Sequence, residues 1–129
     1  MKVLSRILLA FSAILFLFGA WVHTSAFSKV CAAIAKSDLP EFFGKGFKTL
    51  WLMDSALQII LAILFILVAL RPSIASRWVI VLVALIPLAT AMFAYYFIGN
   101  FIAGHLFLVG SLAAILGGLL SRTQLTAGD

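Results

Sequence analysis

Charged residues are scarce in this sequence, and their scarcity excludes most classes of soluble protein. Of 129 residues, nine are Lys or Arg and four are Asp or Glu, which makes 10% charged against 65% hydrophobic. A soluble domain carries about 25% charged residues. An apolar excess of this size has to face lipid, so the sequence predicts an integral membrane protein. Its length corresponds to a single domain over residues 1–129.

Cysteine is almost absent, which limits the available chemistry. The one cysteine, Cys31, excludes an internal disulfide and any metal site built from several cysteines. The formal net charge is +5, but the basic residues stand at the ends of apolar runs, where they orient helices and meet anionic lipid headgroups. They form no continuous basic face in the sequence, so nucleic acid is not an expected partner.

Four apolar stretches are long enough to cross a bilayer. About 20 helical residues span roughly 30 Å of hydrocarbon, and the stretches that qualify are residues 7–26, 50–70, 78–98 and 101–120. The first is longer than the apolar region of a signal peptide, so we expect it to be retained as a span. The sequence therefore predicts an all-α fold, an integral membrane four-helix bundle.

The connection over residues 27–49 has helical character of its own. Residues 28–36 can form a short helix with one apolar side. Asp38 and Glu41 then have the chemistry of a helix start, with Asp38 as the N-cap. Phenylalanines beside lysines in residues 42–48 are typical of a segment that lies at the lipid headgroups. We expect one or two short interfacial helices in this connection.

The placement of arginine predicts the orientation in the membrane. The side that holds both termini carries all four arginines, namely Arg6, Arg71, Arg77 and Arg122. The other side carries four lysines, spread over a long connection that also holds Asp38 and Glu41. Because basic flanks stay in the cytoplasm, we expect a multi-pass protein of the cell inner membrane with a cytoplasmic N-terminus and C-terminus.

Polar side chains within the spans gather near the non-cytoplasmic ends. His23, Asp54 and His105 each lie roughly 5–6 Å inside the hydrocarbon boundary at 1.5 Å per residue. An ionisable group inside a membrane is costly and is by default a functional-site hypothesis. The candidate ligand-binding residues in and around this layer are His23, Trp51, Asp54, Gln58, Thr90, Tyr95, Tyr96 and His105.

These residues also have purely structural interpretations. Asp54 can tie the first two spans together by pairing with Lys48 or His23, and the aromatic residues are common interface anchors. The outer ends of consecutive antiparallel spans adjoin if their connection folds back locally. We therefore predict that His23 and Asp54 are neighbours, and that His105 joins them if its face of the helix points into the bundle.

Small residues mark the faces that should pack inside the bundle. Two spans carry them at regular spacing: Ser5, Ser12 and Gly19 in the first, and Gly110, Ala114 and Gly118 in the last. Small residues at such spacings let membrane helices approach closely.

Short motifs near these positions resemble those of a known group of proteins. They are His23 near the outer end of the first span, an aromatic-rich connection leading into Leu50-Trp51 and Asp54, and Ala69-Leu70-Arg71-Pro72 at the end of the second span. In these features the chain resembles the small four-helix bacterial inner-membrane proteins described as DoxX-like or as domains of unknown function. The resemblance implies a fold and a location, and it implies no activity.

The polar layer leaves several functions open. The first hypothesis is that the protein binds an apolar or amphiphilic ligand, such as a lipid, quinone or isoprenoid, or serves as an accessory subunit of a larger membrane complex. No cofactor is predicted on this hypothesis. An alternative is a haem protein, with the two histidines as axial ligands, or a divalent-metal protein, with His23, Asp54 and His105 as ligands.

Two further alternatives use Asp54 as a titrating group. It could serve a small proton-coupled transporter. Such a transporter would need to form a homodimer, because one short bundle offers little room for a transport path. It could also orient His23 as a general base in an enzyme that acts on a lipid. The layer contains neither a nucleophile motif nor a second carboxylate, so an enzyme is the less favoured interpretation.

Overall fold

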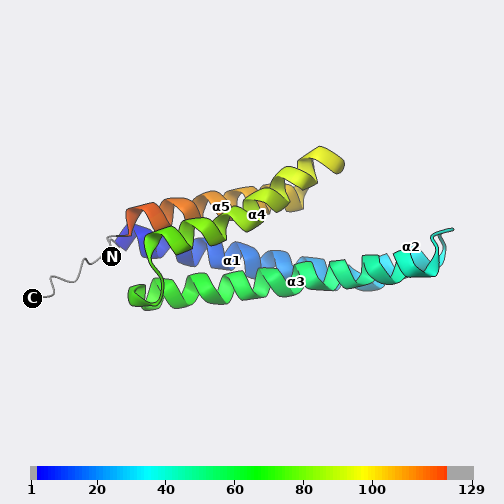
Figure 1. Ribbon diagram of the computed structural model, residues 1–129, viewed down its shortest axis with the longest axis horizontal. Helices are drawn as coiled ribbons and strands as arrows, with labels where there is room; N and C mark the ends of the chain where they lie inside the picture. Colours follow the sequence, from blue (N-terminus) through cyan, green and yellow to red (C-terminus); the bar gives the residue numbers. More distant parts are fainter. Residues whose placement is uncertain (1–2, 122–129) are drawn as a thin grey trace, which may run out of the picture.

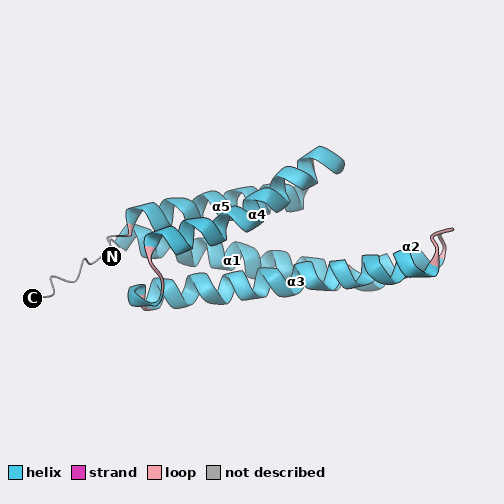
Figure 2. Ribbon diagram, viewed as in Figure 1, coloured by secondary structure: helices cyan, strands magenta, loops and turns pink. Residues whose placement is uncertain are grey.

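The computed structural model describes residues 3–121, and every regular element in that range is helical (Figures 1 and 2). The elements are α1 (Val3–Ser25), α2 (Phe27–Ala35), α3 (Glu41–Leu70), a 3₁₀ turn η1 (Pro72–Ile74), α4 (Arg77–Phe97) and α5 (Ile102–Leu120). Four helical segments are long and apolar enough to cross a membrane, with α1 and α2 counted as one. The predicted all-α four-helix bundle is confirmed, and the chain is a small multi-pass membrane protein.

The first two spans are longer than the sequence patterns indicated. Only Ala26 separates α1 from α2, and its backbone keeps right-handed helical angles. The short helix predicted at residues 28–36 is found as α2, but residues 41–49 form no separate helix, because they are the first turns of α3. The predicted N-cap at Asp38 is wrong. Pro40 takes that position, without a side-chain capping bond.

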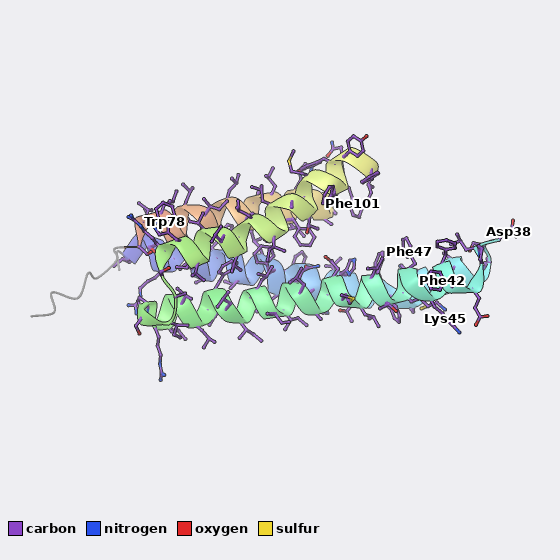
Figure 3. The ribbon with its side chains drawn as sticks, viewed as in Figure 1. Asp38, Phe42, Lys45, Phe47, Trp78 and Phe101 are labelled. Carbon is purple, nitrogen blue, oxygen red and sulfur yellow. The ribbon has the colours of Figure 1, made fainter. Side chains whose placement is uncertain are left out.

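Helix α2 pairs with the first turns of α3, and these paired helices extend beyond the rest of the bundle. Gly44 is buried where α3 meets α2, and a Cβ at this position would stand 3.0 Å from Cγ2 of Ile34. The missing side chain therefore allows the two helices to lie close together. Figure 3 shows Phe42 and Asp38 beyond Phe101, which stands at the end of the shorter α4–α5 hairpin.

Helix α1 holds the bundle together. It packs against α3 and against α5, and α5 packs against α4, whereas α3 and α4 approach each other far less. Near η1 the four helices share one core that includes Leu9, Phe65 and Ile80. Towards the turn at Gly99, which has a left-handed φ of 87° that glycine adopts readily, α4 and α5 diverge from α1 and α3 (Figure 1).

The predicted packing of small residues is confirmed at the α1–α5 interface. Ser5 and Ser12 are fully buried, and their hydroxyls donate to the backbone carbonyls of Gly117 and Gly110. The small residues predicted to face inwards on α5 are also buried: Gly110, Ala114 and Gly118. Close helix approach and two buried hydrogen bonds thus fix this interface.

Arg6 ties α1 to the end of α3. Its Nε donates to the carbonyl of Ala69 at 2.7 Å, and its Nη2 donates to that of Leu70 at 3.0 Å. These carbonyls end a helix, where a cation also meets the negative end of the helix dipole. Arg6 therefore stabilises the fold, in addition to its predicted effect on orientation in the membrane. Arg122, the last of the four arginines, lies outside the described residues.

Candidate functional site

A cavity of about 490 Å³ lies between the α1–α3 and α4–α5 hairpins, and all four long helices line it. Phe16 and Phe107 form its floor, with ring centroids 6.1 Å apart and both side chains buried. Phe97, Ile98 and Ile102, which are largely exposed, form its mouth. Small-molecule sites are about 300–1,000 Å³ in volume, so this cavity has the size of a ligand site.

The cavity begins where the tight pairing of α1 with α5 ends. In this antiparallel interface Ser12 bonds to Gly110. One heptad further along α1 the same register sets Gly19 opposite Ala103, and both residues line the cavity. Instead of a bond to α5, Gly19 receives Gln58 from α3, whose Oε1 occupies the space that a Cβ of residue 19 would need. Glycine at position 19 is therefore what admits Gln58 to the interior.

A polar patch from α1 and α3 forms one wall of the cavity. Oδ2 of Asp54 accepts a hydrogen bond of 2.7 Å from Nε2 of Gln58 and lies 3.7 Å from Nε2 of His23. The predicted proximity of His23 and Asp54 is confirmed. Lys48, the other partner considered for Asp54, makes no ion pair with it in the described part of the chain. About a quarter of the Asp54 side chain, 26%, is exposed, so the carboxylate faces the cavity.

The imidazole of His23 is held in a defined orientation. It stacks on the indole of Trp51, with centroids 3.9 Å apart and planes 7° apart, and Nε1 of Trp51 donates to the His23 carbonyl at 2.8 Å. The Ser55 hydroxyl donates to the Trp51 carbonyl and lies 2.9 Å from Nδ1 of His23. Ser55 and Asp54 thus contact the two sides of the ring, Ser55 at Nδ1 and Asp54 at Nε2, which it approaches to 3.7 Å.

Ser55, His23 and Asp54 bring together the three side-chain types of a serine-hydrolase triad, but their geometry does not fit that chemistry. A triad needs a serine hydroxyl that is exposed to substrate and gives its proton to the histidine. The Ser55 hydroxyl is buried, lies outside the cavity lining and donates to the Trp51 carbonyl instead. Ser55 therefore orients His23. This role of Ser55 could not be predicted from the sequence, because it depends on the rotation of α3.

The opposite wall is almost entirely apolar. Thr90 on α4 is its polar member, and its hydroxyl donates to the Ile86 carbonyl at 3.2 Å. Phe93, Phe101 and Leu106 supply much of the remaining surface. These three could not be predicted from the sequence, because an apolar side chain that lines a cavity is of the same type as one that faces lipid. Of the predicted ligand-binding residues, the cavity brings together His23, Trp51, Asp54, Gln58 and Thr90.

The other three predicted residues do not line this cavity. His105 lies with Nδ1 2.6 Å from the Tyr95 hydroxyl and Nε2 2.7 Å from Oδ1 of Asn100. Tyr96 is 81% exposed. His105, the predicted third member of this layer, does not join His23 and Asp54, because both of its ring nitrogens are engaged within the α4–α5 hairpin. Depth along a span does not determine which way a helix faces.

The alternative metal site needs His23, Asp54 and His105 to converge, and the alternative haem site needs the two histidines to do so. Within residues 3–121, no group of three or more His, Cys, Asp or Glu side chains could hold a metal ion. The predicted three-ligand set is therefore not assembled in the bundle.

Fold and site define a small multi-pass membrane protein with a partly polar intramembrane cavity. No protein-family model, curated protein or solved structure matches the chain.

Proposed function

We propose that this protein binds an amphiphilic molecule of the membrane, such as a lipid, quinone or isoprenoid, in the cavity between its two hairpins. The observation that carries the proposal is the asymmetry of the lining. His23, Asp54 and Gln58 form one polar wall, whereas the floor and the opposite wall are aromatic and aliphatic. A ligand with a polar head and an apolar body matches such a surface.

The free-energy cost of placing the Asp54 carboxylate within a membrane supports a binding role. A carboxylate within a membrane is costly unless it is paired or serves a function. Oδ2 of Asp54 is bonded to Nε2 of Gln58 and lies near the His23 ring, yet the carboxylate still borders an open cavity. A link that only joined α1 to α3 would need no adjoining space of this size.

The arrangement of the helices supports entry from the bilayer. The cavity mouth is formed by exposed apolar residues, and α3 and α4 are the neighbouring spans that approach each other least. A molecule dissolved in the membrane could enter with its apolar part leading. On the arginine distribution, we place the cavity at the non-cytoplasmic side of a bacterial inner membrane, in keeping with the resemblance to DoxX-like proteins.

The test is to fill the cavity and measure what remains bound. Ala103→Phe adds a ring on the cavity wall, whereas Ala89→Phe adds the same ring at an exposed position of α4. Native mass spectrometry of protein purified in mild detergent should find a small molecule bound to the wild type and to Ala89→Phe. Ala103→Phe should lose most of it.

Thr90→Phe provides a second filled cavity, from the opposite wall, should Ala103→Phe fold poorly. Equal amounts of the same bound molecule in the wild type and in well-folded filled variants would contradict the proposal. So would a wild type that carries only the lipids expected around any membrane protein.

A further inference from the structure

Most of the hydrogen-bond donors that line the cavity are already engaged with protein acceptors. Nε1 of Trp51 donates to the His23 carbonyl, and the Thr90 hydroxyl donates to the Ile86 carbonyl. One N–H of the Gln58 amide donates to Asp54, and its second N–H bonds to no acceptor within residues 3–121. The amide of Gln58 must have this orientation, because its oxygen would repel the carboxylate. Nδ1 of His23 is bonded to Ser55, so the lining has few donors left to offer.

The acceptors of the same wall are in surplus. Within residues 3–121, no donor bonds to Oδ1 of Asp54 or to Oε1 of Gln58. The hydroxyl oxygen of Thr90 keeps its lone pairs, because its proton points to its own helix. An acceptor that faces a cavity within a membrane has no water to bond to, which costs free energy, most of all when the acceptor is charged. The wall is therefore complementary to a head group that carries hydrogen-bond donors.

The charge of the lining points the same way. The cavity contains Asp54 but neither lysine nor arginine. An anionic head would meet a carboxylate in a medium of low dielectric, with at most the His23 imidazolium to offset it. Phosphate and carboxylate heads, which need arginine, lysine or several N–H donors, therefore fit poorly.

We infer that the head of the bound amphiphile is an uncharged hydroxyl group, which donates to Asp54 and lies beside Gln58 while the apolar body extends to Phe16 and Phe107. This inference rests on the proposed function and narrows its ligand to the class of long-chain or polycyclic alcohols. Heads that only accept hydrogen bonds, such as esters and ketones, leave the Asp54 oxygen without a donor. Free fatty acids and phospholipids bring a second negative charge.

Trp51 allows head groups to be compared directly, because it lines the cavity. The other two tryptophans, Trp21 and Trp78, are exposed, so Trp21→Phe and Trp78→Phe leave Trp51 as the sole tryptophan, which can be excited selectively over tyrosine in an intact chain. This protein is placed in lipid nanodiscs and titrated with three dibrominated octadecyl compounds, the alcohol, the methyl ester and the ionised fatty acid. Bromine quenches indole fluorescence on contact, so saturable quenching reports occupation of the cavity.

The alcohol should saturate the quenching at about a tenth of the mole fraction that the ester needs, which is the effect of one hydrogen bond to a charged acceptor. The ionised acid should quench only in proportion to its concentration, as a molecule in the surrounding bilayer does. Equal or tighter binding of the ester or the acid would overturn the inference while leaving amphiphile binding in place. Absence of saturable quenching by all three would overturn both.

Asp54→Asn tests the residue that sets the preference. The amide supplies a donor as well as an acceptor, so the advantage of the alcohol over the ester should fall to about twofold or less. Asp38→Asn, in the turn between α2 and α3, makes the same chemical change far from the cavity and should keep the full preference. An unchanged preference for the alcohol over the ester in Asp54→Asn would show that this carboxylate does not discriminate between head groups.

Discussion

The hydroxyl of Ser12 donates a hydrogen bond of 2.8 Å to the backbone carbonyl of Gly110, across the interface of α1 and α5. Ser5 repeats the contact with Gly117 one heptad earlier. These two bonds close one end of the bundle, and at the next heptad, Gly19, the cavity opens. The same small-residue repeat therefore accounts for both the tight interface and the cavity.

Removing these hydroxyls should weaken the bundle. Ser12→Ala should lower the free energy of unfolding by about 0.6 kcal/mol, the average measured for hydrogen bonds between membrane helices, and by no more than about 1.7 kcal/mol, the largest such value. The effect can be measured by thermal or denaturant unfolding in detergent. Ser25→Ala is the matched control, since the exposed Ser25 hydroxyl bonds only to the Val22 carbonyl of its own helix. Equal losses in the two variants would contradict the role of Ser12 between helices.

The four spans could be predicted because the cost of placing charge in hydrocarbon leaves a clear mark on the sequence. The early start of α3 could not, because hydropathy reports the thickness of the bilayer and not the point where a helix ends. Glu41 begins the helix, pairs with Lys45 at 2.6 Å and stands well before the apolar run. Helical hydrogen bonding continues through this polar stretch without any apolar pattern to mark it.

The site was predictable in part, for a related reason. His23 lies close to the small-residue face of α1, and Asp54 on the one polar face of α3, so both could be placed towards the interior. On α5 the small residues marked the inward face, but His105 lies about 140° around the helix from Gly110 at 100° per residue, and its partners come from its own hairpin. The apolar lining was beyond prediction, since Leu106 in the cavity and Leu112 on the exposed surface have the same side chain.

Enlarging Gly110 should disrupt the core. A Cβ at this position would lie 3.0 Å from Cζ of Phe16, a ring that is itself packed against Phe65 and Phe107. Gly110→Leu should therefore destabilise the protein by about 3 kcal/mol or more, at the upper end of overpacking effects. The measurement is the yield of monodisperse protein and its melting temperature.

Gly46→Leu is the control for this substitution, because nothing lies within 4 Å of a Cβ at that position of α3. It should leave folding nearly unchanged or improve it, as leucine favours a helix more than glycine does. Comparable damage from both variants would refute the packing scheme.

Reporter fusions test the predicted orientation. A fusion after Ser76, between η1 and α4, should read cytoplasmic, because Arg71 and Arg77 flank that connection. A reporter inserted after Asp38, in the turn between α2 and α3, should read non-cytoplasmic. The reverse pattern at both sites would place the cavity mouth on the cytoplasmic side, and one exchanged site would contradict the four-span topology.

The stacking of His23 on Trp51 makes the site optically observable. With centroids 3.9 Å apart and rings nearly parallel, a protonated imidazole would lie directly against the indole face, where it makes a cation–π contact and withdraws electron density from the excited ring. In the protein that retains Trp51 alone, fluorescence should therefore fall as the pH is lowered through the titration of His23.

Two variants separate this effect from general titration of the protein. His23→Gln should abolish the fluorescence step, whereas His105→Gln, whose ring bonds to Tyr95 and Asn100 away from the cavity, should leave it in place. Asp54→Asn should shift the midpoint, because it removes the charge 3.7 Å from Nε2 of His23. A step that survives in His23→Gln would mean that Trp51 senses a different group and that the stacked pair is not formed in the membrane.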